Sequence, residues 1–495
     1  MGAVDQICFE YKRRQPELTP CYKVIQEHLA TFVHERELEN RPLPPYVFNE
    51  FEAYLKCGIL AHGFLRLKCC SCSQEKVVGF SCKNRGFCPS CAGKRMIESA
   101  SHLVENVLPL APYRQFVLSF PMPLRYWFQT NRKLFSKVHS IVTNQITRLY
   151  KTKALSQGIK KPITGSISYT QRFGSSLNLN PHIHALWLDG VFTEVEGNLK
   201  FQNVSPITDD EVADLITAIS EKVICLLKKM ELIDSEGNIV QNPLADPLFA
   251  DYESLALATR ASITSKIAFG PNAGKTVTKI GSGFGFEEEI PLAKGKLCFS
   301  INGFSLHANS STNTHQRERL SQLIRYMARG PFSNERLEIL PSGNIKFQLK
   351  TPYPNGVTHL LFTPSEFLEK LTALIPPPRQ HQIRWSGCFA TKSPYLTKIR
   401  LKPEAKKGFD FADKDGDSDR PKNSKWARNL AKAFGIDVLK CNHCGGSLKP
   451  IAALTDPDAI KRYLTHVGLD PLPPARAPPR SLQESFDFMQ EEYES

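Results

Sequence analysis

The chain has 495 residues, of which 41% are hydrophobic and 23% charged, a composition typical of a globular protein with a core of its own. It contains no apolar run of about 18 residues and no apolar stretch behind its first charged residues, so we expect neither a transmembrane helix nor a secretory signal. Lys and Arg number 63 against 49 Asp and Glu, and the net charge of +14 favours a polyanionic partner, nucleic acid ahead of an anionic membrane surface.

The N-terminal part of the chain is expected to be helical on either side of a cysteine-rich segment. Residues 1–55 show a mainly helical pattern with a Pro-rich break at 41–46, and 96–108 has the apolar spacing of another helix. Half of the 14 cysteines lie between Cys57 and Cys91. Without a secretory signal, such clustering indicates metal binding rather than a disulfide framework.

Two Cys-x-x-Cys pairs in this segment have the spacing of the two knuckles of one zinc site. Cys69 and Cys72 are followed, after fifteen residues, by Cys88 and Cys91, and four thiolates so placed can reach one tetrahedral ion. The spacing therefore predicts a structural zinc with no open position for catalysis. Four further residues nearby could bind a second ion or none, and the sequence leaves this open: they are Cys57, His62, Cys70 and Cys82.

Two other features of the zinc-binding segments stay undecided. Lys83 and Arg85 give the first module a basic face that suits DNA phosphates, although a solvated basic face is nearly as common. Near the C-terminus, Cys441 and Cys444 form a single knuckle with no evident second pair. A histidine could complete a second zinc site there, and the candidates are His443 and His466.

The middle of the chain alternates expected strands and helices. Helices are predicted at 208–232 and 315–329, a hairpin is predicted to join 344–350 to 357–362, and the Gly-rich stretch 234–294 looks irregular, like an insertion. Four more segments have the composition of strands: 113–120, 165–169, 183–192 and 297–306.

His182 and His184 are the first candidates for catalysis. On a strand, alternate side chains share a face, so the two imidazoles point the same way. Two neutral imidazoles on one face can hold a divalent ion and leave positions open for a phosphate. Taken alone, this pattern is more often two histidines on an exposed strand face.

Tyr326 is the second candidate. The helix at 315–329 carries an apolar stripe, and Tyr326 lies about 100° away from it, beside Arg319 and Arg329. A tyrosine on such a basic face can attack phosphorus, because neighbouring cations favour the phenolate and bind the phosphate. A surface tyrosine with a solvated hydroxyl group is the alternative.

Five motifs, in the same order along the chain, resemble those of rolling-circle transposases. The resemblance is to the insertion sequence 91 family and its common-region (ISCR) relatives, which carry a His-hydrophobic-His (HUH) motif, and it spans roughly residues 80 to 446. Its motifs are 80–91, 171–184, 325–331, 349–352 and 441–446. Five ordered motifs are far more specific than a His-x-His pair, and they favour the catalytic interpretation of both candidates.

The resemblance implies a DNA transposase that nicks and rejoins single-stranded element ends. His182 and His184 would bind Mg²⁺ or Mn²⁺, and Tyr326 would attack the scissile phosphate to leave a 5′-phosphotyrosine and a free 3′-hydroxyl group. Gln322 stands where relatives with two catalytic tyrosines carry the second one, so the chain resembles the single-tyrosine ISCR branch. His307 is the first candidate for a third metal ligand, ahead of Gln171 and Gln322, although it could equally be a core histidine.

The resemblance also implies the architecture. It is an α+β fold with an HUH-type antiparallel sheet flanked by helices on one face, an N-terminal zinc-binding module and a small C-terminal Cys-x-x-Cys module. The expected parts are a helical and zinc-binding domain at 1–100, a catalytic domain at 101–400 with an insertion near 195–295, a linker at 401–425, a C-terminal module at 426–480 and a disordered acidic tail at 481–495.

The sequence leaves two alternative functions open. The alternatives are a plasmid replication initiator or relaxase and a non-catalytic zinc-dependent DNA-binding protein. The near match to a phosphate-binding loop at 270–276 has three residues between its glycines instead of four, so we expect no ATP site. Host replication factors or supercoiling would then have to expose the single-stranded DNA, in a bacterial cytoplasm and at the nucleoid.

Overall fold

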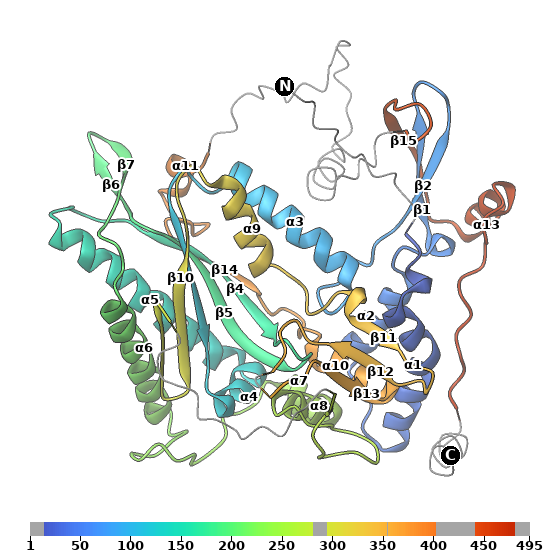
Figure 1. The fold of residues 1–495 in the computed structure, drawn as a ribbon, viewed down its shortest axis with the longest axis horizontal. Coiled ribbons are helices and arrows are strands. Elements are labelled where there is room, and N and C mark those ends of the chain that lie inside the picture. Colours follow the sequence, from blue (N-terminus) through green and yellow to red (C-terminus); the bar gives the residue numbers. More distant parts are fainter. Residues whose placement is uncertain (1–13, 281–294, 354, 402–440, 481–495) are drawn as a thin grey trace.

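The structure is a computed structural model that describes residues 14–280, 295–353, 355–401 and 441–480 (Figure 1). The expected linker at 401–425 and tail at 481–495 lie outside the described residues, apart from residue 401. None of the described helices is long and apolar enough to cross a membrane.

The N-terminal domain begins with helices α1 (Pro20–Leu38) and α2 (Pro45–Lys56), which meet at the predicted Pro-rich break. Pro45 occupies the first position of α2, where a missing N–H costs nothing. The third helix, α3 (Pro89–Asn106), starts seven residues before its predicted beginning, directly after Cys88, and again with a proline in its first turn. Where the structure describes them, the two segments expected to be helical are therefore mainly helical.

A small antiparallel sheet joins the two ends of the chain. Its strand order is β15 (Leu448–Leu454), β1 (Phe64–Cys69), β2 (Glu75–Gly79). Beside it, α13 (Pro457–His466) buries Ile460 and Leu464 against Leu60 and Phe64. The C-terminal segment therefore packs on the N-terminal domain (Figure 1).

The central sheet has six strands, and every neighbouring pair is antiparallel. Its order is β14 (Ile383–Gly387), β4 (Gly165–Phe173), β5 (Leu179–Leu188), β3 (Tyr113–Ser119), β10 (Phe304–Thr312) and β9 (Cys298–Ile301). The α+β fold with an antiparallel sheet is thus confirmed, and β5, which carries the two histidines, lies inside the sheet.

Helices cover both faces of this sheet, rather than one face as expected. On one face, α5 (Arg132–Ser156) and α6 (Asp209–Lys229) pack against side chains such as Phe116 and Trp187. On the other, α3 and α9 (Arg317–Met327) pack against Tyr169 and Leu186 (Figure 1). Sheet side chains on both faces are apolar, so each face needs a covering layer.

Two strand boundaries differ from the prediction because turns interrupt the expected runs. The strand predicted at 297–306 is a hairpin, since Asn302 and Gly303 have φ of 51° and 75° and connect β9 to β10. Asn-Gly is the most common sequence of such a two-residue turn. The strand predicted at 183–192 ends at Leu188, and Phe192 belongs to a second hairpin, β6 (Val191–Val195) with β7 (Asn198–Gln202).

A second sheet of four strands lies beside the first. Its order is β11 (Leu337–Ile339), β12 (Ile345–Gln348), β13 (His359–Phe362) and β8 (Thr278–Ile280), and it packs against α10 (Pro364–Leu374) and α8 (Glu253–Ile263). The predicted hairpin is present as β12 and β13. Both α8 and β8 fall in the stretch expected to be irregular.

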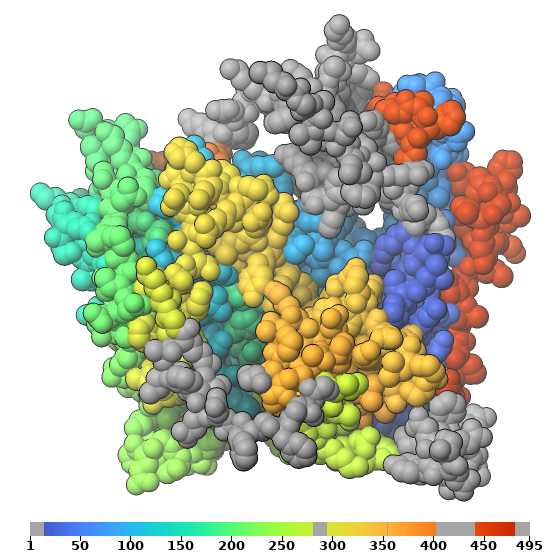
Figure 2. Space-filling view, in the orientation of Figure 1, coloured from blue at the N-terminus to red at the C-terminus, as the bar shows by residue number. Residues whose placement is uncertain are grey.

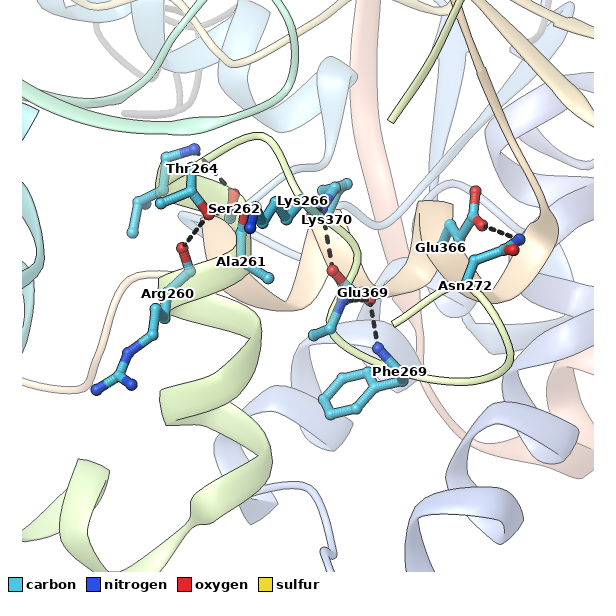
Figure 3. Close-up of polar contacts among 12 residues, drawn as sticks. Arg260, Ala261, Ser262, Thr264, Lys266, Phe269, Asn272, Glu366, Glu369 and Lys370 are labelled. Carbon is cyan, nitrogen blue, oxygen red and sulfur yellow. Dashed lines mark hydrogen bonds and ion pairs between the residues drawn. The ribbon is translucent and has the colours of Figure 1, made fainter. Parts of the chain in front are cut away.

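Buried carboxylates of α10 hold residues 268–272, which are part of the stretch expected to be irregular (Figure 3). The backbone N–H groups of Ala268 and Phe269 donate to Glu369 at 2.7 and 3.2 Å, and Asn272 donates to Glu366 at 3.1 Å. Lys370 pairs with Glu369 at 3.0 Å. Because these groups are satisfied inside the domain, residues 253–280 are an integral part of it.

Candidate functional site

His182 and His184 lie side by side on β5, on the face of the central sheet that α3 and α9 cover. Their ring centroids are 4.8 Å apart, and 9% and 2% of their surfaces are exposed. Opposite His182, across the ladder, are Ser119 of β3 and Gln171 of β4. The register of β5 therefore presents both imidazoles to the same space.

Both imidazoles are neutral at pH 7. Burial lowers the pKa of His182 to about 4 and that of His184 to about 2, and the charge of Arg329 contributes to both shifts. His182 donates its Nδ1 proton to the carbonyl oxygen of Asn180 at 2.7 Å, because a carbonyl can only accept. The lone pair of His182 is consequently on Nε2, where a metal ion could bind it.

His184 is held by a side-chain amide. Its Nδ1 lies 2.8 Å from the amide nitrogen of Gln115, and its Nε2 is buried with no hydrogen-bond partner. An amide can present either oxygen or nitrogen at such a position. With the Gln115 oxygen toward Nδ1, the imidazole would donate there and keep Nε2 free for a metal ion.

Gln171 connects the histidines to the tyrosine helix. Its amide nitrogen donates to the carbonyl oxygens of Tyr326 at 2.9 Å and Met327 at 2.8 Å, the last two residues of α9. These carbonyls have no partner within the helix. The amide oxygen of Gln171 is buried without a partner, and an oxygen is a ligand that Mg²⁺ and Mn²⁺ accept. The atoms present thus fit a divalent ion.

Tyr326 faces the histidines from the last turn of α9. The helix buries Leu320, Ile324 and Met327, as its sequence pattern predicts, and this places the Tyr326 ring 5.7 Å from the ring of His184. The tyrosine nevertheless keeps 41% of its surface exposed. It is therefore both next to the candidate metal ligands and accessible to a large substrate.

Two cations flank the Tyr326 ring. The guanidinium carbon of Arg329 lies 4.6 Å from the ring centroid, and the ammonium nitrogen of Lys350 lies 5.1 Å from it. Arg329 follows α9, as the sequence suggested, whereas Lys350 comes from the loop after β12 in the four-stranded sheet. The two sheets therefore meet at this tyrosine.

Several predicted residues lie apart from this group. His307 stands on β10 opposite Val117, so strand β3 separates it from His184. Among the described residues, the close groups of three or more His, Cys, Asp or Glu side chains consist of cysteines only, so the structure does not bring His307 to the histidine pair. Gln322 and Arg319 are exposed on α9. Of the three candidates for a third ligand, Gln171 is the one directly across from His182.

The cysteines form two clusters, which corrects the predicted single zinc site. One consists of Cys57, Cys82, Cys88 and Cys91, and the other of Cys69, Cys72, Cys441 and Cys444. Within each cluster all sulfur atoms lie within 4.8 Å of one another. The two knuckles predicted to share an ion thus have different partners, because the β1–β2 hairpin turns the first knuckle toward β15 and away from the start of α3.

The sulfur spacing fits tetrahedral zinc. Close Sγ–Sγ distances are 3.3 to 3.8 Å in the first cluster and 3.5 to 3.6 Å in the second. A zinc–sulfur bond of about 2.3 Å would put tetrahedral ligands about 3.8 Å apart. Cys57 and Cys82, which the sequence left undecided, belong to the first cluster, whereas His62 and the exposed Cys70 belong to neither.

Basic residues near the first cluster are only partly free for DNA. Arg95 donates to the carbonyl oxygens of Lys83 and Asn84, so it supports the loop ahead of α3. Lys83 has a φ of 58°, an uncommon backbone conformation for a residue other than glycine. Arg85 is exposed and stays a candidate for phosphate contact.

Two family models match the chain. Residues 165–395, which contain the histidine pair, Gln171, Tyr326 and Lys350, match the model described as "Putative transposase" (Y2_Tnp). Residues 24–120, which contain the whole first cysteine cluster, match the "Transposase zinc-binding domain" (Zn_Tnp_IS91). Neither a curated protein nor a solved structure matches the chain. The two models together cover more than half of the sequence, and the chain belongs to the insertion sequence 91 family of transposases, DNA-processing enzymes that contain structural zinc.

Proposed function

We propose that this transposase nicks and rejoins single-stranded DNA through a covalent bond to Tyr326. The observation that carries the proposal is the position of the Tyr326 ring, whose centroid lies 5.7 Å from that of His184, 4.6 Å from the Arg329 guanidinium carbon and 5.1 Å from the Lys350 nitrogen. A nucleophile for phosphorus needs an accessible oxygen, groups that bind the phosphate and a polarising ion. Each of these requirements has a candidate residue here.

The metal ligands in this proposal are His182, His184 and Gln171. The imidazoles would contribute Nε2 and the amide its oxygen, and the buried, unpartnered state of two of these atoms supports the assignment. A bound Mg²⁺ or Mn²⁺ would polarise the scissile phosphate and offset its charge. Since both histidines are neutral well below pH 7, protons do not compete with the ion in the physiological range.

In the cleavage step, the Tyr326 oxygen forms a bond to phosphorus while the bond to the 3′-oxygen breaks. The tyrosine proton leaves to solvent, and the departing 3′-oxygen takes up a proton. Arg329 and Lys350 would hold the non-bridging oxygens, whose charge grows in the transition state. Because the phosphotyrosine conserves the energy of the phosphodiester bond, a 3′-hydroxyl group can reverse the step and join strands without ATP.

Gln171 has a second role in this scheme. Its two hydrogen bonds to the end of α9 set the position of the Tyr326 backbone relative to β4, directly across from His182. One side chain would thus hold the nucleophile and the metal ion in a fixed relation, which is how an enzyme lowers the entropy cost of reaction. With Gln322 exposed one turn earlier, the scheme uses a single tyrosine, as in the ISCR branch.

The substrate we propose is single-stranded DNA at the ends of the element. The net charge of +14 and the accessible tyrosine agree with a long polyanionic substrate. A strand whose bases are unpaired could also bring its phosphate close to a residue that lies at the junction of two sheets. Host factors that expose this strand remain part of the proposal.

The experiment is a denaturing-gel assay for a protein–DNA adduct. End-labelled single-stranded oligonucleotides that tile both flanks of the gene, on both strands, are incubated with the full chain and MnCl₂ or MgCl₂. We expect a metal-dependent covalent band with the wild type and with Tyr353→Phe, a control in the loop between β12 and β13, and none with Tyr326→Phe.

Two results would contradict the proposal. A band that persists in Tyr326→Phe would assign the nucleophile to another residue. Tight binding of an oligonucleotide without any adduct would instead favour a DNA-binding protein that lacks catalysis.

A further inference from the structure

The second cysteine cluster draws its residues from both ends of the chain. Cys69 ends β1 and Cys72 follows it, whereas Cys441 and Cys444 precede β15, so the closest sulfur pair spans 375 residues of sequence. Only the first two lie within the matched zinc-binding domain, which ends at residue 120. The family match therefore does not account for this cluster.

We propose that a second zinc ion is bound by Cys69, Cys72, Cys441 and Cys444. This ion holds the C-terminal segment on the N-terminal domain, and it is released more readily than the zinc ion of the first cluster. This inference does not depend on the proposed tyrosine chemistry. Four thiolates leave no open position, so the ion is structural.

The backbone around the four thiols is arranged as in two facing zinc knuckles. Ser71 N–H lies 3.4 Å from the sulfur of Cys69, and Gly446 N–H lies 3.4 Å from that of Cys444. Such N–H groups stabilise thiolates, the form that binds zinc. The two loops are also tied together, since the N–H of Cys70 donates to the carbonyl of Ser447 at 3.0 Å.

The close approach of the two loops explains the glycines after Cys444. A Cβ atom on Gly446 would lie 2.6 Å from the Ser71 hydroxyl oxygen and 3.2 Å from the Cys444 sulfur. Gly445 has a φ of 73°, which favours glycine. The motif Cys-x-x-Cys-Gly-Gly is therefore shaped to meet the knuckle that follows β1.

The two clusters differ in their surroundings. In the first, three cysteines are buried and Cys82 is half-buried, within a large core that includes Phe87 and Tyr54. In the second, Cys444 is exposed and Cys72 half-buried, and the core beneath them is small, with Leu67 and Leu448. A chelator or thiol reagent should reach the second site first, because fewer contacts must open.

The zinc ion of the second cluster determines whether the C-terminal segment stays bound to the N-terminal domain. Beyond β15, the segment contributes α13 and then runs along α1 and α2 (Figure 2). There Arg476 pairs with Glu52, and the N–H of Arg480 donates to Thr31 at 3.1 Å. These are exposed polar contacts, each worth little. Of the described residues beyond β15, only Ile460 and Leu464 are buried, in a small core with Leu60 and Phe64, so we expect this part of the segment to come loose when the ion is lost.

The first test is the zinc content of the purified full-length chain, measured by inductively coupled plasma mass spectrometry. We expect two ions per wild-type chain, one in the double variant Cys441→Ser/Cys444→Ser, and two in the control Cys225→Ser, which removes an exposed cysteine outside both clusters. One ion in the wild type, or two in the double variant, would overturn the proposal.

The second test uses the wild type alone and so does not depend on how a variant folds. The protein is treated with EDTA and iodoacetamide for increasing times, and alkylated cysteines are identified by peptide mass spectrometry. We expect Cys69, Cys72, Cys441 and Cys444 to be modified together and at least tenfold faster than the buried thiols of the first cluster. Equal rates for the two clusters would refute the difference in release.

Discussion

Replacing Gln171 by leucine separates two contributions of that side chain. Leucine has a similar size but neither donates nor accepts, so Gln171→Leu removes the hydrogen bonds to Tyr326 and Met327 together with the amide oxygen proposed to bind the metal ion. The two contributions respond differently to added metal. A metal titration can therefore distinguish them.

The expected magnitudes follow from the contacts. Without divalent metal, losing two neutral hydrogen bonds costs about 2 kcal/mol, and removing a buried acceptor without a partner returns about 1–3 kcal/mol, so the free energy of unfolding should change little. At 100 times its dissociation constant, the metal ion stabilises the wild type by about 2.7 kcal/mol. A variant that binds it 100-fold more weakly gains about 0.4 kcal/mol. The free energies of unfolding of the wild type and Gln171→Leu should therefore differ by about 2 kcal/mol when the metal ion is present, and by little when it is absent.

The assay is Mn²⁺ binding followed by electron paramagnetic resonance, together with thermal unfolding with and without MnCl₂. Gln171→Glu restores an oxygen ligand but not the donors, so it should bind Mn²⁺ at least as tightly as the wild type while being less stable without it. Gln322→Leu, on the exposed side of α9, is the matched control and should behave as the wild type. Wild-type Mn²⁺ affinity in Gln171→Leu would refute the assignment of the third ligand.

Two further predictions concern charge. Lys350→Ala should slow adduct formation at Tyr326 by about 100-fold in single-turnover assays, with partial recovery in Lys350→Arg. The control Lys346→Ala, which breaks a surface ion pair, should have little effect. Equal rates in the wild type and Lys350→Ala would exclude a role for this cation. Burial lowers the pKa of His139 to about 4, so between pH 6.5 and pH 4 the unfolded chain binds a proton that the folded chain does not, and stability falls as the pH falls through this window. Urea unfolding at pH 7 and pH 4 should show a loss of stability that is smaller in His139→Leu than in the wild type by up to about 3 kcal/mol, because the other buried histidines respond in both proteins. An equal loss in both proteins would assign the acid sensitivity to other groups.

Local patterns in the sequence predicted most elements that a single period defines. Strand β3 and helices α6 and α9 lie close to their expected positions because their apolar residues repeat with the period of one structure. The predicted elements were wrong where a turn interrupted an apolar run, or where a helix lay among many glycines. Asn302 and Gly303 divided one apolar run into two strands, and α8 was hidden in a Gly-rich stretch whose order depends on carboxylates from α10.

The candidate site was accessible to sequence reasoning only where its geometry is local. Alternation along one strand puts His182 and His184 on one face, and the apolar stripe of α9 points Tyr326 to a separate face. The pairing of cysteine knuckles is not local, because each knuckle has the same spacing whichever partner it meets. Lys350 was likewise visible only as part of a motif, since its distance from Tyr326 depends on how two sheets pack.

The end of strand β4 determines how those two sheets meet. Gln171 caps the end of α9, and the next residue, Arg172, donates to the carbonyl oxygens of Ala373 and Leu374 at the end of α10 and to Gln129 of α4 (Met122–Thr130). Arg172 is buried, and desolvation lowers its pKa to about 10, so the guanidinium remains charged at neutral pH. A cation is retained there because three acceptors would otherwise be left unsatisfied.

Two adjacent residues thus join the helix of the proposed nucleophile to the module that contributes Lys350. Because α10 packs on the sheet that contains β12, a shift of Arg172 would move the loop after β12 relative to Tyr326. The distance between tyrosine and lysine is therefore set by hydrogen bonds at one strand end and not by the tip of a free loop. Arg172 lies in the matched transposase domain, yet among the described residues it makes no hydrogen bond to the two histidines or to Tyr326. The position that it gives to the Lys350 loop explains why a buried arginine is present there.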